Sequence, residues 1–400
     1  MELVSKKKKV SELFIKLLLL IPLSTLVQEY IPGINKILFS FSVVFLFAYI
    51  FSVKLYGYKW CVLFLGGIIW AIALCNTTWE MLYINENMAI YYIFCIAYLL
   101  FFLSAKDKIW DELYNSQKYI FFIIFIYTII LVISIPLPIS YTNIAGSTWG
   151  DALYFVSFSG SPNRVGQASL FICSLMILLL VMKFPQRRAL LLFTIPNLYV
   201  FLMGGSRTYF VLGTCVLLLF SYVYVDNPKR FKYIFWGLLA VFCVLLMSSN
   251  MMNKFAGAYR PDIVDNRVFW IKLTSARSAF WLEQLSYFFN SPILYQFFGN
   301  GININWIVSG IWAHNDFIEI VCSYGYIGLL LYLITIVLFI RGFLNKVFIN
   351  NWIKWMCVFI WLFNASFNMF FPYFNAMLSY SFLLLAFCKY KKVTRQEKDI

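Results

Sequence analysis

The sequence predicts an all-α polytopic integral membrane protein with about 12 transmembrane helices, both termini in the cytoplasm and two long external loops. Three observations predict this class. Of the 400 residues, 62% are hydrophobic and 12% are charged, whereas soluble domains are about 25% charged. The hydrophobic residues form runs long enough to cross a hydrocarbon core roughly 30 Å thick. Lysine and arginine are concentrated in alternate connections between these runs.

The hydrophobic runs are the predicted spans, and they form a single transmembrane domain over residues 1–400. The predicted spans cover residues 13–32, 35–53, 60–75, 87–104, 119–138, 166–183, 189–205, 208–225, 233–250, 316–340, 352–371 and 373–388. The first run follows Lys6 to Lys9, as in a signal sequence, but no A-x-A cleavage pattern comes after it, so we expect a retained span. The sequence "FFPYF" at Phe370 to Phe374 predicts a very tight turn between the last two spans.

The distribution of positive charge predicts the orientation of the spans. If the N-terminus is cytoplasmic, every even-numbered connection is basic, as the positive-inside rule requires. These connections contain Lys54 and Lys59; Lys106, Lys108 and Lys118; Lys183, Arg187 and Arg188; Lys229, Arg230 and Lys232; Arg341 and Lys346; and the tail from Lys389 to Lys398. The net charge of +15 then reflects topology and does not indicate a nucleic-acid partner. The nine cysteines are scattered without a C-x-x-C pair, which favours small apolar side chains over a disulfide or metal framework.

Two predicted external loops are long, about 139–165 and about 251–315, and loops of this length are uncommon without a function. The loops and the adjoining span ends carry half of the arginines, namely Arg164, Arg207, Arg260, Arg267 and Arg277. Arginine on the side that the topology rule disfavours indicates an anionic ligand there. For Arg260 and Arg267 the nearby Asp262 and Asp265 offer an alternative, which is ordinary pairing on the surface.

The only histidine, His314, closes the second long loop. In "HNDFIE", Asp316 and Glu319 are spaced like a capping box, so we expect the span to begin near Asp316, with His314 and Asn315 at its external mouth. An imidazole in that position keeps a pKa near 6.5, which suits it to accept a proton at neutral pH. The alternative is an interfacial histidine satisfied by hydrogen bonds. One histidine without clustered carboxylates or thiols does not predict a metal site.

Two further motifs place an arginine near the external membrane surface. In "SPNRVGQ", Ser161 and Pro162 predict a helix start, with Arg164 in the first turn beside backbone N–H groups that also attract anions. In "GGSRTYF", Arg207 lies in a very short turn, where an unpaired charge is costly. For Arg164, snorkelling toward lipid headgroups is the alternative.

A last motif, "RSAFW", opens an amphipathic external helix that is followed by the glycine-rich turn "GNG". We expect Phe280, Leu282, Leu285 and Phe288 to lie on the membrane while Arg277 faces the loop. A guanidinium binds phosphate oxygens through two N–H groups at once, which lysine cannot do.

Taken together, "SPNRVGQ", "GGSRT", "RSAFW" with "GNG", and "HNDFIEIVCSYGYIG" resemble, in this order, the O-antigen ligase and polymerase superfamily of bacterial envelope glycosyltransferases. The resemblance covers roughly residues 159–331. It implies a helical enzyme of the cytoplasmic membrane that acts on the outer face, without metal, nucleotide sugar or cofactor. The donor would be an oligosaccharide on polyprenyl pyrophosphate. His314, Arg207 and Arg277 match the family's histidine and arginines, whereas Arg164 occupies a position that is not reliably arginine there.

We therefore expect a polymerase that joins lipid-linked repeat units into O-antigen or capsular polysaccharide. His314 would activate the acceptor, and the predicted substrate-binding residues are Arg277, Arg207, Arg164, Arg260, Arg267 and Asn315. A flippase and a chain-length regulator are expected partners beside the bilayer. Two alternatives remain open: a ligase that transfers the glycan to a lipid core or a protein, and a flippase or other transporter of lipid-linked oligosaccharides. A transporter predicts ionisable residues at mid-membrane, whereas the polarity here is concentrated on one face.

Overall fold

The structure is a computed structural model that describes residues 2–31, 57–143, 153–225, 277–345 and 350–396, with a few single positions within 33–43 and 231–247. Two predicted spans, 35–53 and 233–250, lie essentially outside the described residues. Arg260 and Arg267 also lie outside them, as does the first part of the second long loop.

The described residues are almost entirely helical. The helices are α1 (Glu2–Leu26), α3 (Tyr58–Cys75), α4 (Trp79–Ile84), α5 (Met88–Asn115), α6 (Gln117–Ser134), α7 (Pro162–Val181), α8 (Arg187–Met203), α9 (Arg207–Val225), α13 (Arg277–Asn290), α14 (Ile293–Phe298), α15 (Ile304–Ser309), α16 (Asp316–Leu344), α17 (Asn351–Phe367) and α18 (Phe374–Gln396), with short 3₁₀ turns η1 (Pro138–Ser140) and η2 (Ser157–Ser159). One antiparallel ribbon joins β1 (Tyr141–Asn143) to β2 (Leu153–Phe155), with Thr142 opposite Tyr154.

Six described helices are long and apolar enough to cross a membrane, namely α3, α5, α6, α7, α9 and α16. The described part is thus all-α and suited to a bilayer, as the sequence predicted. Every predicted span within it coincides with a helix, including the last two on either side of "FFPYF". The full number of spans and the cytoplasmic location of the termini remain predictions.

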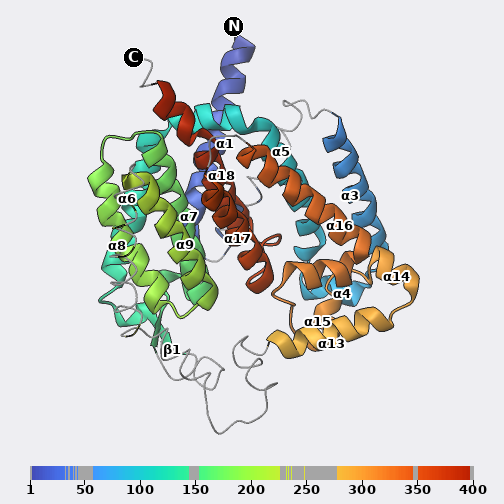
Figure 1. The fold of residues 1–400 in the computed structure, drawn as a ribbon. Coiled ribbons are helices and arrows are strands. Elements are labelled where there is room, and N and C mark those ends of the chain that lie inside the picture. Colours follow the sequence, from blue (N-terminus) through green and yellow to red (C-terminus); the bar gives the residue numbers. More distant parts are fainter. Residues whose placement is uncertain are drawn as a thin grey trace.

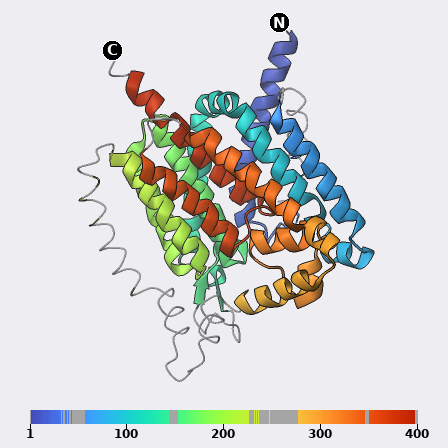
Figure 2. The same cartoon turned by 45° about the vertical axis from the view of Figure 1, so that its right-hand side comes forward.

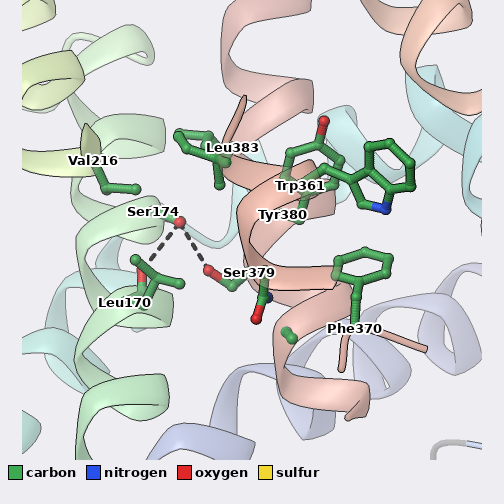
Figure 3. Close-up of a pocket in the computed structure, with 11 residues that line it drawn as sticks. Leu170, Ser174, Val216, Trp361, Phe370, Ser379, Tyr380 and Leu383 are labelled. Atoms are coloured by element: carbon green, nitrogen blue, oxygen red, sulfur yellow. Dashed lines mark hydrogen bonds between the residues drawn. The ribbon is translucent and has the colours of Figure 1, made fainter. Parts of the chain in front are cut away.

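Helix α7 lies at the centre of the bundle and is buried along nearly its whole length. It packs against α18, α9 and α1 (Figure 1). Polar side chains inside the bundle pair with each other, since the hydroxyls of Ser174 and Ser379 lie 3.0 Å apart and those of Tyr127 and Ser169 lie 2.8 Å apart. Beside the serine pair is a cavity of about 10 Å³ (Figure 3), about the size of one water molecule. At this point the interior is too closely packed to admit a sugar.

One end of the bundle carries both described chain ends and a set of basic contacts. Lys59 donates to the Ser104 hydroxyl at 2.9 Å, Lys106 to the Gly342 carbonyl at 2.8 Å, Lys389 to Asp107 at 2.5 Å, and Arg187 to the Tyr224 carbonyl at 2.8 Å. Several connections that the charge pattern assigned to one side therefore do meet at one end. The ribbon, α4 and α13 to α15 lie at the opposite end, while α3, α5 and α16 run side by side between the two (Figures 1 and 2).

Candidate active site

Helix α16 is broken at Gly325, whose φ of 72° and ψ of −175° are not helical. The Tyr332 hydroxyl donates to the Asp316 carboxylate, 16 residues earlier. In an unbroken helix these residues would lie about 24 Å apart along the axis, so the chain must turn back at the break. The predicted helix start near Asp316 is confirmed, but the helix is interrupted at Gly325, so the segment from Asp316 to Tyr324 and the longer segment that ends at Leu344 run in different directions.

The "GNG" turn, Gly299 to Gly301, supplies hydrogen-bond donors to the carbonyls at this break. Asn300 N–H donates to the Cys322 carbonyl at 2.9 Å, and Gly301 N–H donates to the Ser323 carbonyl at 3.3 Å. These are the carbonyls that a helix end leaves without partners. The backbones approach so closely that a Cβ on Gly299 would lie 2.1 Å from the Ser323 oxygen. Two of the motifs that carried the family resemblance thus fit together backbone to backbone.

The N-terminus of α16 is capped by Asn315, whose side-chain oxygen accepts from Phe317 N–H at 2.9 Å and Ile318 N–H at 3.2 Å. The predicted capping box led by Asp316 is wrong by one residue, because Asp316 is directed away from its own helix end. Glu319 does reach back past the helix start, and its carboxylate accepts from Ala313 N–H at 3.1 Å. The Asn315 amide also donates to the Ser366 carbonyl at 3.1 Å. In this structure Asn315 therefore fixes the position of the backbone next to His314.

The turn between α17 and α18 gathers several helix ends. The Asp316 carboxylate accepts from Phe370 N–H at 2.7 Å and from Phe371 N–H. The Phe367 carbonyl accepts from the Arg277 guanidinium and from the Thr208 hydroxyl. This one turn therefore brings together the first residues of α9, α13 and α16, which come from three of the sequence motifs.

Arg277 and His314 are brought together by Trp281. Arg277 and Trp281 lie one turn apart on the same face of α13, and the Trp281 indole donates to the carbonyl of Ala313, the residue before His314. His314 itself has a φ of 50°, a conformation that is uncommon outside glycine. The docking of α13 thus fixes the histidine beside the arginine.

Burial, and next to it the positive charge of Arg277, lower the pKa of His314 to about 4. The expected value near 6.5 is wrong, because partial burial against α13 and the neighbouring positive charge of Arg277 both disfavour the protonated imidazole. At neutral pH the imidazole is therefore uncharged. Its Nδ1 atom is buried and has no hydrogen-bond partner within the described part of the chain.

Arg207 and Arg164 lie in the same region. The Ser206 hydroxyl donates to the Asn163 side chain at 2.8 Å, which ties "GGSRT" to "SPNRVGQ". Burial lowers the pKa of Arg277, and the charge of Arg207 acts in the same direction, so the two guanidinium groups lie within electrostatic reach. Arg164 donates to the Glu29 carboxylate at 3.4 Å and to the Ser159 carbonyl at 3.1 Å. Part of its positive charge is therefore already paired with Glu29.

The sequence reasoning missed Tyr373, within "FFPYF". Burial raises the pKa of Tyr373, while the charges of Arg277 and Arg164 lower it. Even so, 40% of the residue is exposed. Tyr373 is therefore accessible from solvent and lies within electrostatic reach of both arginines. The only sequence signal was its position in the tight turn.

The predicted membrane contact of α13 is partly wrong. Leu285 and Phe288 belong to a cluster with Ile304, Ala313 and Cys322, so they face the protein. The stripe is apolar because it carries the loop before His314, not because it lies on lipid. Leu282 is 71% exposed, and its contact with the membrane stays a prediction.

The candidate site therefore groups His314, Arg277, Arg207 and Arg164, with Tyr373 within electrostatic reach of Arg277 and Arg164. It combines fixed positive charge with a neutral imidazole, which is an arrangement that can hold an anion next to a group able to accept a proton. No family model matches the chain, and no similar curated protein or solved structure was found.

Proposed function

We propose that the protein is a membrane glycosyltransferase that polymerises oligosaccharide repeat units linked to polyprenyl pyrophosphate. The observation that carries this proposal is the pairing of Arg277 with His314 at the end of the bundle opposite the termini. The motif resemblance supports the choice of donor. The proposed location is a bacterial cytoplasmic membrane, with this end of the bundle on the outer face.

In the proposed reaction a hydroxyl of the acceptor repeat unit attacks C1 of the donor sugar. The bond between C1 and the phosphate oxygen breaks, and its electron pair leaves on the polyprenyl pyrophosphate. Arg277 and Arg207 stabilise the charge that develops there, with Arg164 at the edge. His314 accepts the proton of the attacking hydroxyl, an effect typically worth about 10²–10⁴-fold in rate.

The low pKa of His314 fits this sequence of events. Before the donor binds, the neighbouring Arg277 disfavours protonation of the imidazole. A bound pyrophosphate brings negative charge to Arg277 and offsets its positive charge, which raises the proton affinity of the imidazole. The base would thus become stronger when the leaving group is in place.

The test uses purified protein in lipid nanodiscs, supplied with lipid-linked repeat units from the native host. A ladder of products with the repeat units alone supports the polymerase. Transfer only after a lipid core or protein acceptor is added would replace it with the ligase. Movement of lipid-linked units across a vesicle bilayer without any new glycosidic bond would replace both with a transporter.

A further inference from the structure

A second hollow lies at the same end of the bundle, between α4, the α13–α14 pair and α15. It is a groove of about 610 Å³, within the range of roughly 300–1,000 Å³ that is usual for ligand sites. It is open at the surface, and one wall is the "GNG" turn that completes the break in α16. The Asn76 amide secures this wall by donating to the Gly299 carbonyl at 3.0 Å.

The lining of the groove indicates the kind of ligand. Amides are supplied by Asn76, Asn290 and Asn300, and phenol rings by Tyr287 and Tyr295. An amide can donate to one hydroxyl and accept from another, and an aromatic ring offers an apolar face with a polar tip. Sugars present both hydroxyls and apolar C–H faces, so this set matches a carbohydrate.

Charge narrows the ligand further. Glu80 is the only charged residue of the lining, which contains no lysine or arginine. A carboxylate accepts hydrogen bonds from sugar hydroxyls, but it repels phosphate. The groove therefore differs in chemistry from the arginine cluster and is suited to a neutral segment of glycan, not to the pyrophosphate.

The groove is connected to the candidate site through its floor. Met81 and Ile304 line the groove and belong to the same buried cluster as Ala313, which precedes His314. We infer that the groove binds sugars of the glycan chain that lie several residues away from the bond being formed. This inference rests on the proposed function, because it assumes that a glycan is present at this end of the bundle.

The experiment measures binding of the free oligosaccharide released from the host's lipid-linked repeat units by mild acid, using the full-length protein in nanodiscs. The test variant combines Asn290→Ala with Tyr295→Ala, two exposed positions of the groove. The control is Tyr83→Ala, because Tyr83 is exposed on α4 but lies outside the lining. A second control, His314→Ala, alters the candidate site alone.

We expect the oligosaccharide to bind the wild type, Tyr83→Ala and His314→Ala equally, and the double variant at least tenfold more weakly. Equal binding by the double variant would overturn the groove as the site. A wild type that forms a product ladder but binds no free oligosaccharide would also overturn it, while leaving the proposed function intact. Binding that is lost in the double variant, from a protein that forms no glycosidic bond, would support the groove and reject the polymerase.

Discussion

The proton affinity of His314 can be measured without any assumption about function, because the chain has a single histidine. Protein labelled with isotopic histidine, and carrying no histidine tag, gives one imidazole signal in an NMR titration. We expect a midpoint at about 4, compared with 6.5 for an unperturbed imidazole. The difference corresponds to roughly 3 kcal/mol of disfavoured protonation.

Two substitutions separate the causes of this shift. Arg277→Met removes the positive charge but leaves the burial, so the midpoint should rise without reaching 6.5, because burial is the larger cause. Arg277→Lys keeps a positive charge nearby and should leave the midpoint low. A wild-type midpoint near 6.5 would refute the burial of His314, and an unchanged midpoint in Arg277→Met would refute its contact with the arginine.

Three other predictions follow from the same geometry. Arg277→Lys should lower kcat/KM by roughly 10–100-fold while the protein still inserts into the membrane, because a lysine cannot donate two parallel hydrogen bonds to a phosphate. The product ladder, measured at matched amounts of protein in the membrane, checks this prediction. Products of normal chain length would remove Arg277 from the site. Gly325→Ala should lower the thermal stability in nanodiscs far more than Gly310→Ala, since both glycines have positive φ but only at Gly325 would a Cβ lie 2.2 Å from the Phe297 carbonyl; equal losses would mean that the close approach is not real. The His314 pKa is lower in the folded than in the unfolded chain, so this residue should reduce stability as pH falls from about 6.5 to about 4; His314→Gln should weaken that dependence in pH-resolved unfolding, and identical slopes would contradict it.

Much of the fold could be predicted from the sequence, because hydrophobic length and the placement of lysine depend on local composition. The same reasoning placed Arg207, Arg277 and His314 on one side of the membrane. It could not show that they meet. That meeting depends on the turn from Ser366 to Phe371, whose backbone groups bind residues from distant helices.

The break at Gly325 was not predicted because no charged residue and no proline interrupts the run between Glu319 and residue 340. A helix can end there only because Asn300 and Gly301 supply N–H groups to its last carbonyls. The low pKa of His314 could not be predicted from the sequence for a similar reason. A loop position predicts contact with water, and the docking of Trp281 onto Ala313 is a tertiary contact that no local pattern reveals.

The central claim is that His314 accepts a proton while a glycosidic bond forms. The most direct measurement counts polyprenyl pyrophosphate released from lipid-linked repeat units by the purified wild type and by His314→Ala, at pH 7 and with saturating substrate. We expect the wild type to release one polyprenyl pyrophosphate per new glycosidic bond. The variant should release it at a rate lower by about 10²–10⁴-fold. Release at the wild-type rate by His314→Ala would contradict the claim.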